Sequence, residues 1–314
     1  MTVVEKAADK FAVGVTSGGD FVSPKQTVRV ASVQLALTPA VSVDELITRI
    51  AHHVKTASDY ACDFICFPEH VTLQILADRI DRGAEQSITN LAAQTAIWYG
   101  ALSSLAKDHS INIIGGSHVD VRPSSERRNV CIFAHRDGRI ETRDKVHPTP
   151  DERDVWKLEG GDDVSPIQTD CGPIGILICY DSEFPELSRW LVDQAPIDIL
   201  FVPYLTDTRA GHFRVRYCCH ARTIENQHYV VTSGMVGNIE RVTNLEMAYA
   251  QSAILTPNDA GFARDGIAAE AEPQIEQMIF ADLDPRALRT ARESGAVRNL
   301  ADRRKDLYDV SWKR

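Results

Sequence analysis

The chain has 314 residues, of which 44% are hydrophobic and 25% charged, a composition typical of a globular protein with a large buried core. Its formal net charge is −10, from 44 acidic and 34 basic residues, and this balance argues against a nucleic-acid-binding protein, which needs clustered positive charge. No stretch approaches the roughly 18 uninterrupted apolar residues of a membrane span, so no membrane partner is expected.

The seven cysteines indicate a reducing compartment. Their number is odd and their spacing irregular, and Cys66 and Cys131 lie inside apolar runs, which favours free thiols over a disulfide framework. The N-terminus mixes acidic and basic residues and lacks a long apolar stretch, so no signal peptide is expected. We therefore expect a cytoplasmic protein.

Residues 1–26 show little periodicity and are interpreted as a flexible N-terminal arm. After the arm, short apolar runs alternate with segments whose apolar residues recur at helical spacing. In chain order, these patterns predict strand 28–35, helix 44–60, strand 64–67, helix 91–109, strand 111–115, strands 130–135 and 140–145, strand 174–179, helix 184–192, strand 197–202, helix 213–226, and strands 229–234, 252–255 and 278–283.

The order of these elements favours a layered α/β fold with mixed sheets over an all-parallel doubly wound sheet. Asp137-Gly138 lies between two strand-like runs and predicts a hairpin turn in the middle of the chain. No internal repeat or low-complexity linker is evident, so we expect one domain over residues 27–283. Residues 284–314 are expected to form a C-terminal helix and tail at a subunit interface.

Three reactive side chains each follow an apolar strand: Glu69 in CFPEH, Lys145 in TRDKVH and Cys179 in LICYDSEFPE. A rigid sheet aims side chains at its strand ends toward one rim, where α/β folds collect functional groups. Each stretch alone is weak evidence, because a cysteine after an apolar run is most often a structural thiol. Together they supply a nucleophile, a proton acceptor and a cation.

This combination suits acyl chemistry. A free thiol with a pKa of about 8.5 is mostly protonated at neutral pH, and a nearby carboxylate that accepts its proton is typically worth about 10²–10⁴ in rate. A nearby ammonium favours the thiolate and then the oxyanion. Cys179 lies between a predicted strand and a helix that begins near Pro185, and such a turn exposes the nucleophile. The backbone N–H of Tyr180 is then a second candidate oxyanion donor.

Glu in FPE, Lys in DKVH and Cys in CYDSEFPE, in that order, resemble the Glu-Lys-Cys triad of the nitrilase superfamily of carbon–nitrogen hydrolases. The resemblance runs from the first predicted strand to the RRKDLY tail. It implies a four-layer α-β-β-α sandwich with mixed sheets. It also implies that Glu69 is the general base, Lys145 the cationic stabiliser and Cys179 the nucleophile. Family members commonly have a second glutamate that orients the site, and Glu152 takes that place here, with Asp151 as the weaker candidate.

Within the superfamily, Tyr180-Asp181 after the cysteine resembles the amide-cleaving branches, since nitrilases typically have Trp-Glu there. The stretch from FVPYLTDTRAGHF to VVTSGMVGN resembles a poorly characterised amidohydrolase subgroup. The resemblance implies an amidase that acts on small linear amides through a cysteine thioester, without a cofactor, and that forms a homodimer or larger homo-oligomer. N-carbamoyl hydrolysis, acyl transfer to an amine and a non-catalytic scaffold remain open; nitrile hydrolysis is disfavoured.

The candidate substrate-binding residues follow strand 197–202, and they are Tyr204, Thr206 and Arg209. The Arg209 guanidinium suits a substrate carboxylate. The alternative for Arg209 is an ion pair with Asp207 or Glu225.

Two further patterns are interpreted as structural. His147, two residues after the lysine, suggests a Cys-His pair, but the superfamily does not use this histidine as the base, and a hydrogen-bonding role is favoured. Cys218-Cys219-His220 lies in a predicted helix, where adjacent side chains point in different directions, and no second ligand cluster is evident. We therefore predict no metal site. No phosphate- or dinucleotide-binding motif follows a strand.

Overall fold

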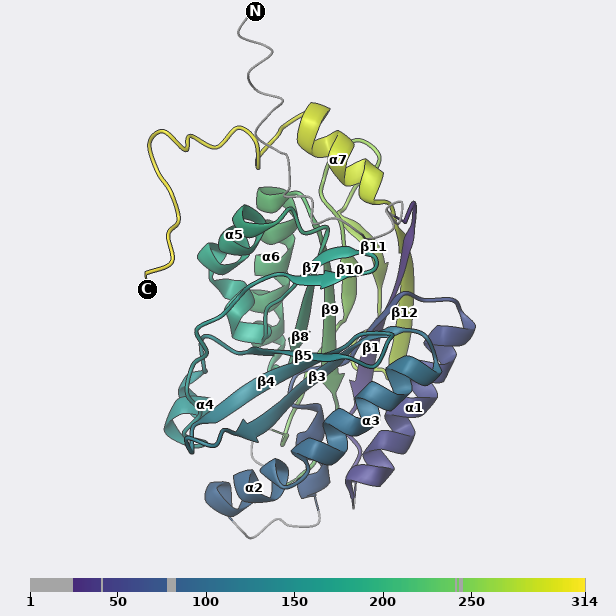
Figure 1. Cartoon of the computed structure of the whole chain (residues 1–314), viewed down its shortest axis with the longest axis vertical. Helices are drawn as coiled ribbons and strands as arrows, with labels where there is room; N and C mark the ends of the chain where they lie inside the picture. Colours follow the sequence, from purple (N-terminus) through teal and green to yellow (C-terminus); the bar gives the residue numbers. More distant parts are fainter. Residues whose placement is uncertain (1–24, 41, 78–82, 241, 243–244, 314) are drawn as a thin grey trace, which may run out of the picture.

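The computed structural model describes residues 25–40, 42–77, 83–240, 242 and 245–313 (Figure 1). All but the last two residues of the predicted N-terminal arm lie outside this range. Among the described residues, no helix has both the length and the apolar character needed to cross a bilayer.

Two mixed sheets form the centre of the fold. In the first, the strand order is β5-β4-β3-β2-β1-β12; in the second it is β6-β7-β8-β9-β10-β11. The first sheet comprises β1 (Val28–Ala36), β2 (Phe64–Cys66), β3 (Asn112–Val121), β4 (Arg127–Ala134), β5 (Ile140–Asp144) and β12 (Gln277–Leu283). The second comprises β6 (Ile167–Thr169), β7 (Gly172–Ile176), β8 (Ile199–Tyr204), β9 (Tyr229–Val236), β10 (Ala253–Leu255) and β11 (Ile267–Glu270).

In both sheets the central strands pair in parallel and the outer strands antiparallel. At its end, β1 also pairs with β9, through Leu35–Met235 and Ala36–Val236, and this joins the two sheets at the carboxyl ends of these two strands. Between the sheets, the buried rings of Phe64 and Phe201 lie 5.4 Å apart. Truncating such a buried phenylalanine to alanine typically costs about 3–5 kcal/mol of stability.

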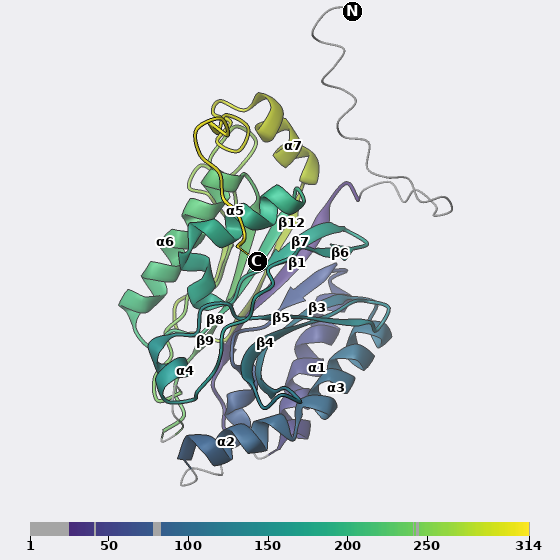
Figure 2. The ribbon, with the colours of Figure 1, turned by 60° about the vertical axis from the view of Figure 1, so that its left-hand side comes forward.

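Helices cover the outer faces of the two sheets. The described helices are α1 (Val43–Asp59), α2 (Gly83–Ala92), α3 (Thr95–Asp108), α4 (Pro150–Asp154), α5 (Pro185–Gln194), α6 (Arg209–Asn226) and α7 (Pro285–Ser294), with 3-10 turns η2 (Val71–Leu76) and η3 (Cys179–Glu183). Figures 1 and 2 show α1 and α3 on the side of the first sheet and α5 and α6 on the side of the second. The layers therefore run α-β-β-α, as predicted.

The apolar residues whose spacing predicted the first helix are the ones that the structure buries. Ser42 caps α1 by accepting a hydrogen bond from the Glu45 N–H, and Leu46, Ile50 and Val54 face the sheet, fully buried. The predicted hairpin also forms, between β4 and β5, where Gly138 adopts a φ of +89° that other residues rarely reach.

The predicted helix 91–109 is wrong in its boundaries. The chain forms two helices there, because α2 ends at Ala92 and α3 begins at Thr95. The Thr95 hydroxyl bonds to His118 Nε2 at 2.9 Å and donates to Asp120 Oδ1 at 3.1 Å, which attaches the start of α3 to β3. This long-range contact has no local sequence signal. The short elements α4, β6 and β11 were likewise not predicted.

Candidate active site

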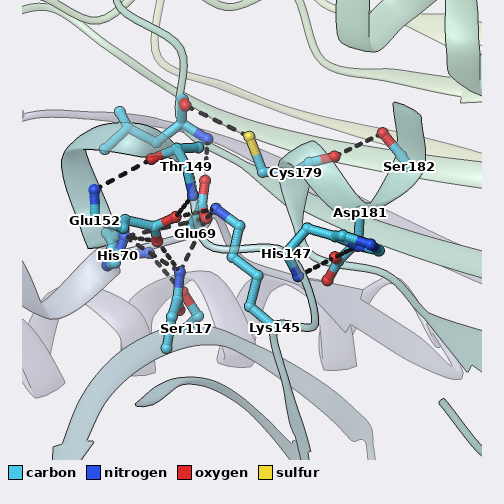
Figure 3. Close-up of polar contacts among 12 residues, drawn as sticks. Glu69, His70, Ser117, Lys145, His147, Thr149, Glu152, Cys179, Asp181 and Ser182 are labelled. Carbon is cyan, nitrogen blue, oxygen red and sulfur yellow. Dashed lines mark hydrogen bonds and ion pairs between the residues drawn. The ribbon is translucent and has the colours of Figure 1, made fainter. Parts of the chain in front are cut away.

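Residues at three strand ends meet at one cavity of about 430 Å³. Glu69 follows β2, Lys145 directly follows β5, and Cys179 begins η3 after β7. Glu152 from α4 lines the same cavity. Figure 3 shows the side chains of Glu69, Lys145, Glu152 and Cys179 close together. The structure thus brings together the three residues of the predicted triad and the predicted second glutamate.

The Lys145 ammonium lies between two carboxylates. Its Nζ donates to Glu69 Oε1 at 2.8 Å and to Glu152 Oε2 at 2.6 Å. The lysine side chain is only 1% exposed and both carboxylates are similarly buried. Charges buried this deeply are tolerated only when they are paired and hydrogen-bonded, so the three side chains hold one another in place.

These pairings set the ionisation of the buried groups. Burial by itself lowers the pKa of Lys145, but the carboxylates of Glu152 and Glu69 outweigh it and raise that pKa well above its usual value. Burial opposes ionisation of Glu152, yet the Lys145 ammonium and His70 hold the pKa of this carboxyl well below its usual range. Lys145 is therefore a permanent cation at neutral pH.

Leu205 connects the carboxylate to the thiol. Its backbone N–H donates to Glu69 Oε2 at 3.0 Å, and its carbonyl oxygen accepts from Cys179 Sγ at 3.6 Å. One oxygen of Glu69 is therefore held by lysine and the other by the loop that faces the thiol. This arrangement orients the carboxylate toward the cavity that Cys179 also lines.

Cys179 has the backbone conformation of a nucleophile at a sharp turn. Its φ is +48°, a left-handed value that costs a non-glycine residue roughly 1–3 kcal/mol and persists where the surrounding structure imposes it. Burial and the Glu69 carboxylate raise the pKa of the thiol well above its usual value, although Lys145 acts in the opposite direction. The resting thiol therefore keeps its proton, and a base must remove that proton when attack begins.

Asn129 and His70, which are not among the predicted site residues, complete the buried network. Asn129 Nδ2 donates to Glu69 Oε1 at 3.0 Å and to Glu152 Oε1 at 2.7 Å, so one amide bridges the two carboxylates. His70 Nε2 lies 2.9 Å from Glu152 Oε1. His70 directly follows Glu69 in the sequence, and this position could have identified it as a site residue. Asn129 lies in no recognisable motif.

The same residues raise the question of a metal ion. Ligand atoms of Glu69, His70 and Glu152 lie within 4.8 Å of one another. The Lys145 ammonium, however, already bonds to both carboxylates at 2.8 and 2.6 Å. A metal ion would have to displace this cation, so the donor set is better suited to lysine than to a metal.

The predicted substrate-binding residues divide into two groups. Tyr180 and Thr206 line the cavity, although the Thr206 hydroxyl donates to the Tyr249 carbonyl oxygen at 2.8 Å. The Tyr204 side chain instead points into the core, where its hydroxyl accepts from the Gln251 N–H at 3.2 Å. Its position at the end of a buried strand turns it away from the cavity.

Arg209 does not reach the cavity either. It is the first residue of α6, and its guanidinium lies 5.4 Å from the centre of the Phe213 ring. Within the described part of the chain, Arg209 neither pairs with Asp207 or Glu225 nor lines the cavity. Arg214, further along the same helix, lines the cavity in its place. The phase of the helix, which the sequence pattern does not specify, decides which arginine faces the site.

The sequence of the chain is similar to those of known carbon–nitrogen hydrolases. A sequence profile for carbon–nitrogen hydrolases matches residues 29–293. The chain is 41% identical over 287 residues to the probable hydrolase YhcX of Bacillus subtilis, an alignment that covers 91% of this chain and 56% of that protein, so the chain spans little more than half of YhcX. It is 27% identical over 294 residues to omega-amidase NIT3 of Saccharomyces cerevisiae, covering 90% and 95% of the two chains.

Solved structures show the same fold. The crystal structure of yeast Nit3, a member of the nitrilase superfamily, matches with a TM-score of 0.71 at 24% identity, over 86% of this chain and 95% of that one. The amidase from Nesterenkonia sp. AN1, solved as a double mutant in complex with acrylamide, matches with a TM-score of 0.68 at 18% identity, over 94% and 98% of the chains. These likenesses confirm the predicted α/β architecture.

Proposed function

Because the chain belongs to the carbon–nitrogen hydrolase family, we propose that it is an amidase that hydrolyses small linear amides through a thioester on Cys179. The observation that carries this proposal is the convergence of Glu69, Lys145 and Cys179 on one cavity. Of two relatives, YhcX is named as a probable hydrolase and NIT3 as an omega-amidase, and the second name agrees with amide hydrolysis.

The geometry suggests the role of each group in forming the thioester. As Cys179 Sγ attacks the amide carbon, its proton passes to Glu69, which is the carboxylate beside the thiol. The oxyanion that develops is stabilised by the Lys145 ammonium, whose charge the two glutamates maintain. Glu69 then donates the proton to the departing nitrogen, which leaves as ammonia or an amine.

Hydrolysis completes the cycle. Water attacks the thioester carbon and gives a proton to Glu69, the carbon–sulfur bond breaks, and the proton returns to the Cys179 sulfur as the acid departs. The related fold of the Nesterenkonia amidase supports a nucleophilic role for Cys179, since one structure of that protein shows the acetamide moiety of fluoroacetamide covalently added to its active-site cysteine. Acyl transfer differs only in the nucleophile that attacks the thioester.

The proposal is tested with the Cys179→Ala variant. Ammonia release from a panel of simple aliphatic amides and N-carbamoyl compounds should fall to background, while circular dichroism and thermal unfolding stay unchanged. Cys218→Ala, which removes a half-exposed thiol from α6, should retain activity. Mass spectrometry of the quenched wild type should find an acyl adduct on Cys179. Turnover by the Cys179→Ala variant would refute the mechanism, and a dominant amide product with an added amine would indicate acyl transfer instead.

A further inference from the structure

The charged residues around the cavity are predominantly acidic. Among the described residues that line it, five carboxylates face two permanent cations; the carboxylates belong to Glu69, Asp151, Glu152, Glu183 and Asp207, and the cations to Lys145 and Arg214. Lys145 is already shared by two buried glutamates. Among the other charged residues of the lining, three carboxylates therefore outnumber one cation, the Arg214 guanidinium.

Glu183 is the most firmly placed of these outer carboxylates. It is the last residue of η3, the turn that begins with the nucleophile Cys179, and its side chain is 12% exposed. The buried Arg222 donates to the carbonyl oxygens of Ser182 and Glu183, at 3.1 and 3.4 Å, and so braces the end of the turn. These bonds hold the backbone at Glu183 in place, and its side chain lines the cavity.

Arg214, the partner of Glu183, is held much less firmly. Its Nε donates to both carboxylate oxygens of Glu183 at 3.0 Å, but the arginine side chain is 62% exposed. Pairs with one long, solvated side chain contribute only about 0–1 kcal/mol, and such a side chain can move into water at little cost. A cationic ligand could therefore replace Arg214 on the Glu183 carboxylate.

We propose that the preferred substrate is an amide with a protonated amine at its far end, and that Glu183 binds this ammonium in place of Arg214. This inference rests on the proposed function, since it assumes that the amide lies at Cys179. A cavity mouth with excess carboxylates raises the local concentration of cations and repels anions. The alternative, a substrate carboxylate bound by the outer N–H groups of Arg214, would place an anion near Asp151, Glu183 and Asp207.

The experiment compares three amides of matched length: 3-aminopropanamide, which is cationic, butanamide, in which a methyl group replaces the ammonium, and succinamate, which is anionic. For the wild type, we expect kcat/KM from ammonia release to rank cation, neutral, anion. Raising the ionic strength from about 0.01 to 0.15 M shortens the Debye length from about 30 to 8 Å. This change should lower kcat/KM for the cation and leave that for butanamide unaffected.

Glu183→Gln supplies the residue-specific test. The ratio of kcat/KM for 3-aminopropanamide to that for butanamide should fall by about tenfold or more, because the variant loses a charged hydrogen bond to the ammonium. Glu186→Gln removes an exposed carboxylate from the first turn of α5 and should leave the ratio unchanged. If Glu183→Gln does not fold, Asp207→Asn at the exposed mouth should lower the same ratio, though by less.

The outcomes separate this inference from the proposed function. Hydrolysis of butanamide with a preference for succinamate over 3-aminopropanamide would overturn the inference and leave the amidase proposal intact. An unchanged cation-to-neutral ratio in Glu183→Gln would exclude Glu183 as the group that binds the ammonium. If none of the three amides gives ammonia in a Cys179-dependent manner, both proposals are contradicted.

Discussion

Asp181, two residues after the thiol, binds the chain at His147, two residues after the buried lysine. Its Oδ1 accepts from the His147 backbone N–H at 2.8 Å and lies 2.9 Å from the ring Nδ1, while Oδ2 accepts from the Val146 N–H at 3.0 Å. The His147 ring also stacks on Phe184 at 3.8 Å. One carboxylate therefore joins two parts of the site: the turn that contains Cys179 and the segment that contains Lys145.

This contact predicts that Asp181→Asn lowers both stability and activity. An asparagine retains one acceptor oxygen but places an NH2 group against a backbone N–H that then lacks a partner, at a cost of about 1–3 kcal/mol. Urea unfolding should show this loss, and kcat should fall because Lys145 is no longer held in register with Cys179. Asp154→Asn, at an exposed site on α4, is the control and should behave as wild type. Full activity in Asp181→Asn would show that the two segments are positioned independently.

Glu152→Gln should change the pH profile as well as the rate. Glu152 raises the pKa of Lys145, so removing its charge lowers the pKa of the ammonium. The alkaline limb of the kcat/KM profile should therefore move to lower pH than in the wild type, with a reduced maximum. Glu159→Gln, at an exposed position, should leave the profile in place. A fall in rate with no shift of the alkaline limb would limit Glu152 to a structural role.

Two buried histidines should make the protein sensitive to mild acid. Burial lowers the pKa of both His118 and His228 to about 3. The unfolded chain, with histidine pKa values near 6.5, binds more protons than the folded one between those limits, so stability falls as the pH drops below about 6.5. Together the two residues should contribute a slope of about 2.7 kcal/mol per pH unit near pH 5.

The measurement is urea unfolding at a series of pH values between about 6.5 and 4. His118 bonds to the hydroxyls of Thr72 and Thr95, which glutamine can also reach. In His118→Gln the slope should therefore decrease by about 1.4 kcal/mol per pH unit. An unchanged slope would mean that His118 titrates alike in the folded and unfolded chains.

The expected homodimer, with the segment 284–314 at the interface, remains a prediction. Tyr217 and Ile224 of α6 are 66% and 41% exposed, and we select them as candidate interface residues. Light scattering should give at least twice the 34.8 kDa chain mass. Tyr217→Arg should reduce that mass, whereas Ile97→Arg on α3, at the opposite side of the sandwich, should not. A monomeric wild type would contradict the expectation.

Local sequence patterns were sufficient to locate most of the elements. Apolar periodicity placed α1, β1, β2, β8 and β9 to within about two residues but ended β3 too early, and Asp137-Gly138 located the β4–β5 hairpin. Apolar periodicity did not predict the break between α2 and α3, where Thr95 bonds to residues of β3. Short-range rules describe what the chain prefers within a few residues, and that break depends on a strand more than twenty residues away.

The sequence by itself determined that Glu69, Lys145 and Cys179 stand at strand ends, because hydrophobic runs and the residues that end them are local properties of the chain. Only the tertiary structure decided what surrounds them: Asn129 bridging the carboxylates, Leu205 linking Glu69 to the thiol, and Arg214 rather than Arg209 at the cavity. Those contacts depend on strand register, helix phase and the packing of two sheets. Each of these is set by the packing of the whole core, so no short stretch of sequence specifies them.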